Sequence, residues 1–110
     1  MSDRRAALIW CPFPDRVSAK KVARQLLAQK LIACANIVPA IESVFEYEGR
    51  CESETECGVL FKTVEDSLGD AIARLGELHP YDTPAIVGWH CDAAHDATLD
   101  WLTATTTTGD

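Results

Sequence analysis

Residues 33–63 read ACANIVPAIESVFEYEGRCESETECGVLFKT, and this stretch decides the fold. Residues 33–47 are rich in Ile, Val, Phe and Tyr, which predicts a long strand with Pro39 at an edge or a bulge. The EGR turn at residues 48–50 then leads into residues 55–63, which predict a returning strand. About fifteen strand residues span roughly 50 Å, whereas a domain of this size has a radius of gyration of about 13 Å. The hairpin must therefore project from the domain or bend at Pro39.

A strand and a helix are predicted before the hairpin. Residues 6–11 form a short apolar run closed by prolines at 12 and 14, which is typical of a strand buried on both faces. Asp15 can cap the next segment, in which apolar residues recur at steps of three and four as far as Lys30. This spacing predicts an amphipathic helix.

Two helices and a strand are predicted after the hairpin. An amphipathic helix begins at Asp66 or Ser67 and is stopped by Pro80. Residues 85–91 form another doubly apolar strand, and Asp96 can cap a short last helix. The order β-α-β-β-α-β predicts an α+β, ferredoxin-like sandwich in which two helices cover one face of a four-stranded antiparallel sheet.

The length of 110 residues suits one domain, because a chain this short buries enough surface for a single core. We expect this domain over residues 1–102. Residues 103–110 are almost all Thr, Gly and Asp and lack an apolar period, so they predict a polar, mobile tail.

Charge and cysteine usage narrow the partners and the compartment. Seventeen acidic residues against ten basic ones give a formal charge of −7, which disfavours nucleic acid and anionic lipid as partners. No signal peptide or membrane span is expected, because the first apolar run is far shorter than about twenty residues. The five cysteines are odd in number and contain no C-x-x-C pair, which favours free thiols in a reducing cytoplasm.

The predicted sheet has one face without a cover. Residues 6–11 and 85–91 are apolar on both faces, yet two helices cover only one face of a four-stranded sheet. A projecting hairpin also exposes unpaired backbone edges. Symmetric association with further copies of the chain would cover the open face and these edges, so we expect an oligomer.

Six short motifs follow one another along nearly the whole chain and carry a resemblance to a known family. They are CPFPD at 11–15, KLIACANI at 30–37, EG at 48–49, FKT at 61–63, HPYDTP at 79–84 and LDWL at 99–102. In these motifs and their order, the sequence resembles members of the CutA family.

The resemblance implies a subunit of a homotrimer, similar in architecture to PII signalling proteins, in which long hairpins embrace neighbouring subunits. It also implies a link to divalent cation tolerance, particularly to copper, with no accepted reaction. The sequence contains no glycine-rich phosphate loop, no G-x-S-x-G and no H-E-x-x-H motif. We therefore expect a binding or signalling protein that is not an enzyme and requires no cofactor.

Cys11 and His79 are the candidate metal ligands, since a thiolate and an imidazole suit copper or another divalent metal. The family resemblance supports these positions, but Ala85 stands where many relatives have an acidic residue and Leu78 where some have a histidine. The alternative is structural: Cys11 is a small core residue, and cationic His79 ends a helix where it meets the helix dipole favourably.

A second candidate site is a cleft where subunits meet. Its residues match family motif positions or replace a tryptophan that relatives carry, and they would offer one cation and aromatic walls to a small anionic ligand: Tyr47, Lys62, Tyr81, Thr83 and Trp101. Packing without a ligand is the alternative role for all five.

Two further patterns are weaker candidates. His90 and Cys91 are adjacent in a strand and point to opposite faces, so they do not converge on one ion with His95. Glutamates gather on the hairpin, where they would meet hard cations, keep the edge solvated or dock a protein partner: Glu46, Glu48, Glu52, Glu54 and Glu56.

Overall fold

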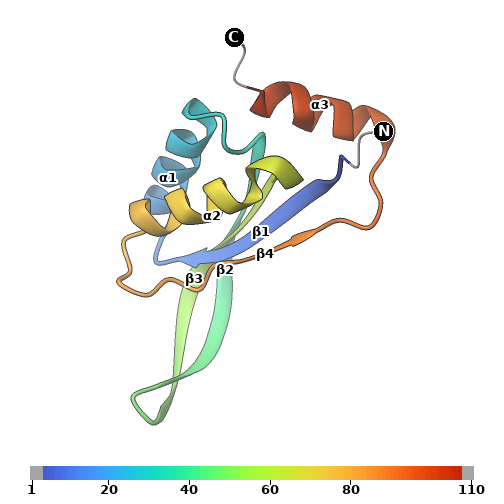
Figure 1. Cartoon of the computed structure of the whole chain (residues 1–110). Helices are drawn as coiled ribbons and strands as arrows, with labels where there is room; N and C mark the ends of the chain where they lie inside the picture. Colours follow the sequence, from blue (N-terminus) through green and yellow to red (C-terminus); the bar gives the residue numbers. More distant parts are fainter. Residues whose placement is uncertain (1–3, 108–110) are drawn as a thin grey trace.

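Four strands form one antiparallel sheet in the order β2-β3-β1-β4, in a computed structural model that describes residues 4–107. The elements are β1 (Ala6–Phe13), α1 (Arg16–Ala28), β2 (Cys34–Tyr47), β3 (Arg50–Val64), α2 (Glu65–Leu78), β4 (Val87–His90) and α3 (Asp96–Thr106). This order and pairing confirm the predicted α+β, ferredoxin-like sandwich. Figure 1 shows α1 and α2 on the same face of the sheet.

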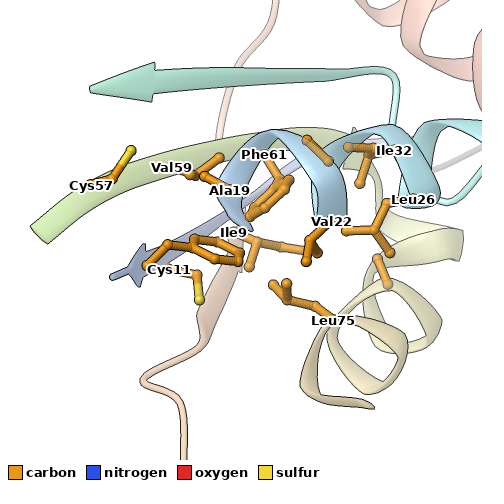
Figure 2. Close-up of a cluster of buried hydrophobic side chains, with 13 residues drawn as sticks. Ile9, Cys11, Ala19, Val22, Leu26, Ile32, Cys57, Val59, Phe61 and Leu75 are labelled. Atoms are coloured by element: carbon orange, nitrogen blue, oxygen red, sulfur yellow. The ribbon is translucent and has the colours of Figure 1, made fainter. Parts of the chain in front are cut away.

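The main core lies between the sheet and helices α1 and α2 (Figure 2). Ile9 and Phe61 face the helices from β1 and β3, and Leu26 and Leu75 meet them from α1 and α2; all four are fully buried. Helix α1 starts where predicted, because the Ser18 N–H donates to the Asp15 carboxylate at 2.8 Å. Burial of this apolar surface is the main favourable contribution to folding.

Helix α2 ends because of the proline that follows its last residues. His79 precedes Pro80 and has extended backbone angles, φ −68° and ψ 141°, as a residue before proline prefers. The helix starts at Glu65, one residue before the predicted range, and its acidic first turn complements the positive end of the helix dipole.

The hairpin of β2 and β3 projects beyond the rest of the sheet (Figure 1). Its turn places Glu48 at φ 52° and Gly49 at φ 78°, the left-handed pair that a tight two-residue hairpin connection uses. β3 begins at Arg50, five residues earlier than predicted, because it pairs with β2 up to that turn. The register shifts between Val38 and Ile41, so Pro39 lies in an irregularity of an edge strand, as expected.

Strand β4 is shorter than the predicted strand over residues 85–91. Val87 to His90 form the strand that pairs with β1, and the Cys91 N–H adds one bond to the Ala6 carbonyl oxygen at 2.8 Å. Ile86 instead packs against the main core from outside the strand. The apolar run at residues 85–91 therefore includes a residue that is apolar because it packs on the core and not because it lies in a strand. The spacing of apolar residues does not distinguish these two cases.

Helix α3 extends past the predicted end of the domain, so a mobile tail from residue 103 is wrong for residues 103–106. The hydroxyls of Thr103 and Thr106 donate to the carbonyl oxygens of Leu99 and Leu102, each at 2.8 Å. Leu102 is buried in a second, smaller core with Ala6 and Ala33, which fixes the helix on the sheet. Residues 108–110 of the predicted tail lie outside the described residues.

The sheet face opposite α1 and α2 is apolar and partly exposed. We call it the open face and define it by Leu8 and Trp10 of β1, Leu60 of β3, and Val87 and Trp89 of β4. Along β1 and β3 these residues alternate with buried core residues, so their side chains point away from the helices. Val87 and Trp89 lie directly opposite Trp10 and Leu8, so they point to the same side. Trp89 is 45% exposed and Val87 is 59% exposed.

Gly58 allows the Trp10 ring to lie flat on the open face. A Cβ at residue 58 would clash with Trp10 Cη2, would lie 2.8 Å from Trp10 Cζ2 and would lie 3.2 Å from Ile41 Cδ1. Residue 58 must therefore be glycine as long as the indole keeps this position.

Gly58→Ala should destabilise the protein by about 1–3 kcal/mol, because the indole or the strand must shift. Gly69→Ala is the matched control: no atom lies within 4 Å of its added methyl, and alanine stabilises a helix interior by roughly 0.5–1 kcal/mol relative to glycine. Denaturant unfolding of both variants should give free-energy changes of opposite sign. Equal effects would contradict the proposed contact between Gly58 and Trp10.

Candidate functional site

A groove of about 1070 Å³ lies between the hairpin and the connector from α2 to β4. Phe45 and Tyr47 of β2 line one side, and Tyr81, Asp82 and Thr83 of the connector line the other. The remaining lining residues are Pro12, Ser43, Glu46, Arg50, Glu52, Glu54, Glu56, Pro80 and Ala85. The hairpin is long enough to form a wall here because its strands continue past the end of β1.

Three of the five residues predicted for the cleft line this groove, namely Tyr47, Tyr81 and Thr83. Lys62 and Trp101 do not. Lys62 pairs with Leu8 and Cys34 toward the other end of β3, six residues beyond Glu56 and therefore about 20 Å along the strand. Trp101 lies on α3, which packs at the end of the sheet away from the hairpin (Figure 1).

Tyr81 and Glu56 form the floor of the groove. The Tyr81 hydroxyl donates to Oε2 of Glu56 at 2.8 Å. Glu56 is only 9% exposed. Burial raises the pKa of the Tyr81 phenol well above its ordinary value, and the hydrogen bond to Glu56 and its charge raise it further. Tyr81 is therefore a neutral hydrogen-bond donor.

His79 is held as the neutral imidazole by two hydrogen bonds. The Tyr81 backbone N–H donates to His79 Nδ1 at 3.1 Å, so this nitrogen carries no proton, and Nε2–H donates to the Pro12 carbonyl oxygen at 2.9 Å. The ring stacks on Phe13 with centroids 4.3 Å apart. Burial lowers the pKa of His79, although the Pro12 hydrogen bond and the charge of Glu56 oppose this shift.

The structural alternative for His79 is thus half confirmed. His79 is the C-cap residue of α2, as expected, but the lowered pKa favours the neutral ring over the cation. Its position depends on hydrogen bonds and on stacking rather than on the helix dipole.

Cys11 lies in the main core and is fully buried, as expected if it is a small core residue. Burial, with a smaller effect from the charge of Glu56, raises the pKa of the Cys11 thiol to about 12. Its S–H donates weakly to the Pro12 carbonyl oxygen at 3.5 Å, which is also the acceptor for His79. The structure therefore brings the two candidate metal ligands together as donors to one oxygen.

This geometry does not favour a metal at Cys11 and His79. A metal needs the thiolate and a free imidazole nitrogen, whereas the thiol is protonated and both ring nitrogens of His79 are engaged. Across residues 4–107, no group of three or more His, Cys, Asp and Glu side chains is arranged to hold a metal ion. Ala85 lines the groove nearby and offers no oxygen ligand.

The charge of the groove opposes the predicted anionic ligand. Its lining includes one guanidinium, that of Arg50, which lies near Glu52 with 3.6 Å between Nε and Oε2. Five carboxylates surround the same space: Glu46, Glu52, Glu54, Glu56 and Asp82. A small anion would be repelled here unless another chain supplied cations.

Glu56 and Phe45 are two of the groove residues that the sequence did not single out for the cleft. Alternation along β3 placed the hairpin glutamates on one face, but it did not show that the connector buries one of them. Phe45 carried no motif that distinguishes it from an ordinary strand residue.

The sheet order, the projecting hairpin and the groove beside it define a small α+β protein of the ferredoxin-like type, with a candidate binding site at the base of an extended hairpin. The family model of the CutA1 divalent ion tolerance protein matches residues 7–105. The chain belongs to this family, which confirms the resemblance seen in the sequence.

Relatives of known name cover nearly all of the chain. A divalent-cation tolerance protein CutA of Pyrococcus horikoshii is 40% identical over 95 residues, which are 86% of this chain and 92% of that protein. A crystal structure of CutA1 from Ehrlichia chaffeensis superimposes with a TM-score of 0.91 at 35% identity, covering 96% of this chain and 99% of the other. A chloroplastic CutA of Arabidopsis thaliana is 35% identical over 86% of this chain and 52% of its own length.

The pH dependence of stability should reveal the buried neutral His79. The unfolded imidazole has a pKa of about 6.5 and the folded one a lower value, so the unfolded state binds the extra proton first as the pH falls. Stability is therefore full above pH about 6.5 and declines below it, by at most about 1.4 kcal/mol per pH unit.

Unfolding at pH 7.0 and pH 5.5 should show this decline in the wild type and a smaller one in His79→Gln. His95→Gln is the control, because His95 is exposed and adjoins α3 outside the core. If His79→Gln left the decline unchanged, the neutral, buried state of His79 would be refuted.

Proposed function

We propose that this chain acts as a homotrimeric, non-catalytic binding or signalling protein of divalent cation tolerance. The main support for this proposal is the open face, whose apolar side chains include the half-exposed Trp89. In a monomer these apolar side chains would contact water, which is unfavourable. A further copy of the chain is the simplest cover. The number three, and the likeness to PII proteins, come from the family resemblance.

The hairpin supports the same proposal. Among residues 4–107, no strand pairs with its outer edge on β2, and the structure is 49 Å long in its largest dimension but only 26 by 21 Å across. Such an extended, one-sided edge invites pairing with another chain. A neighbour that covers the open face would be near enough for this hairpin to reach around it.

The chemistry of the two most reactive candidates supports a non-catalytic role. Cys11 is a poor nucleophile at neutral pH, because its thiol is buried with a pKa of about 12. His79 is a poor general base, since its unprotonated nitrogen already accepts the Tyr81 N–H. Neither group has the exposure that a covalent or proton-transfer step needs.

The proposal requires no bound cofactor. Copper or another divalent metal is the cation whose tolerance the family name concerns, and we propose a cytoplasmic location on the evidence of five free cysteines. The name of the chloroplastic relative shows that the compartment differs within the family. Within residues 4–107, every helix is too short or too polar to cross a membrane.

Val87→Glu should convert the assembly into monomers, because it places a charge within the apolar open face. Val17→Glu is the matched control: Val17 is 79% exposed on α1, away from the open face, whereas Val87 is 59% exposed on β4. Sedimentation velocity at micromolar concentration should show trimers for the wild type and for Val17→Glu. The wild-type melting temperature should also rise with protein concentration.

A monomeric wild type would refute the trimer. An intact trimer in Val87→Glu would show that association uses a surface other than the open face.

Calorimetric titration of the reduced protein with copper and zinc should show no stoichiometric site that depends on Cys11 or His79. The physical reason is the thiol pKa of about 12 and the engaged ring of His79. Cys11→Ala and His79→Ala should bind as the wild type does, whereas Cys51→Ala should lose any weak binding at the exposed hairpin thiol. Tight binding that either core variant abolishes would establish the metal site instead.

A further inference from the structure

Glu56 is largely buried, and among residues 4–107 no cation pairs with its carboxylate. Its Oε2 accepts from Tyr81 at 2.8 Å, and within residues 4–107 the side chain has no ion pair and no second hydrogen bond. The residue is 9% exposed, and it lines the groove. Within residues 4–107 no buried side-chain oxygen lacks a hydrogen-bond partner, so the second oxygen of Glu56 keeps contact with solvent and can accept a cation that enters the groove.

The groove cannot supply that cation from its own lining. Arg50 lies near Glu52 and pairs with Tyr47 across the hairpin, six residues from Glu56 and therefore roughly 20 Å away along β3. Glu54 lies between them and also lines the groove. The field at Glu56 is therefore negative. Burial is the main cause of the raised pKa of the Tyr81 phenol and of the Cys11 thiol, and the charge of Glu56 raises both further.

The groove that contains the Glu56 carboxylate is also lined by aromatic rings that are partly exposed. Phe45 and Tyr47 line the hairpin side of the groove and remain 38% and 58% exposed, while Tyr81 lines the connector side. Ring faces attract cations and pack against methylene groups and other rings. The combination of one buried carboxylate with several rings is the chemistry that recognises an organic ammonium or guanidinium group.

We propose that this groove binds a small organic cation, whose ammonium or guanidinium group pairs with Glu56 and whose carbon skeleton packs on Tyr81, Phe45 and Tyr47. An inorganic divalent ion fits less well, since it needs several converging ligands and no such cluster occurs within residues 4–107. An anion is repelled by the surrounding carboxylates. This binding activity goes beyond the proposed trimer, and all of its residues come from one chain.

The test is calorimetry on the assembled, full-length protein with three probes of one shape: 2-phenylethylamine, 2-phenylethanol and phenylacetate. The amine should bind about tenfold or more tightly than the alcohol, because only the amine makes a charge-assisted hydrogen bond to Glu56. Phenylacetate should not bind. Equal binding of the amine and the alcohol, or preference for phenylacetate, would overturn the proposal.

Glu56→Gln should lose at least about tenfold in amine affinity, since the amide keeps an acceptor for Tyr81 and removes the charge. Glu42→Gln is the matched control: Glu42 is exposed on the same hairpin and does not line the groove. Tyr47→Ala, at a side chain that the fold leaves exposed, should also weaken the amine. An unchanged affinity in Glu56→Gln would exclude Glu56 as the partner of the cation.

A ligand-free measurement distinguishes a free amine from a lysine of another copy. If Glu56 is unpaired in the assembly, Glu56→Gln should raise the melting temperature, and Glu42→Gln should leave it unchanged. The other outcome is that Glu56→Gln lowers the melting temperature and that Lys62→Met creates amine binding that the wild type lacks. It would mean that the Lys62 ammonium of a neighbouring copy already pairs with Glu56. That result would overturn the proposal while leaving the trimer intact.

Discussion

The two-sided apolar character of β1 is the constraint on which the rest of the structure depends. β1 pairs with β3 on one side and with β4 on the other, so it lies inside the sheet. Its Ile9 and Cys11 complete the core under the helices, while Leu8 and Trp10 form the middle of the open face. The same strand thus completes the core under the helices and leaves the domain with a surface to cover. The groove depends on it too, because His79 is fixed by the carbonyl oxygen of Pro12 in β1.

Core and groove are connected by a short series of hydrogen bonds. Pro12 holds His79, His79 accepts the backbone N–H of Tyr81, and the Tyr81 hydroxyl reaches Glu56. The neutral state of His79 is therefore part of the structure that positions the groove. It explains how a connector with no regular structure can present a tyrosine at a defined place.

The element order could be predicted because each element has a local signature. The β2–β3 hairpin is identified by its glycine turn, and helix α1 by the Asp15 cap and the spacing of its apolar residues. The end of α3 was not predicted, because threonine is a weak helix former. The packing of Leu102 in the second core stabilises the last turn of the helix, and the sequence pattern does not show this contact. The groove was half predicted: Tyr47, Tyr81 and Thr83 meet there, but motif membership does not fix where along a strand Lys62 lies. Burial of Glu56 was not predictable, since it depends on a connector 25 residues further along.

The register of the sheet has a consequence for the order in which the molecule can be built. β4 is the last strand, and it pairs with the first one, Ala7 opposite His90, across most of the chain. Contacts so distant in sequence form late, whereas the hairpin and the helix pair use residues synthesised earlier. All buried residues of the main core precede Val87 and Trp89 in the chain. The open face is complete only when the chain is nearly finished, so neighbouring nascent chains have little to recognise in one another until each can fold.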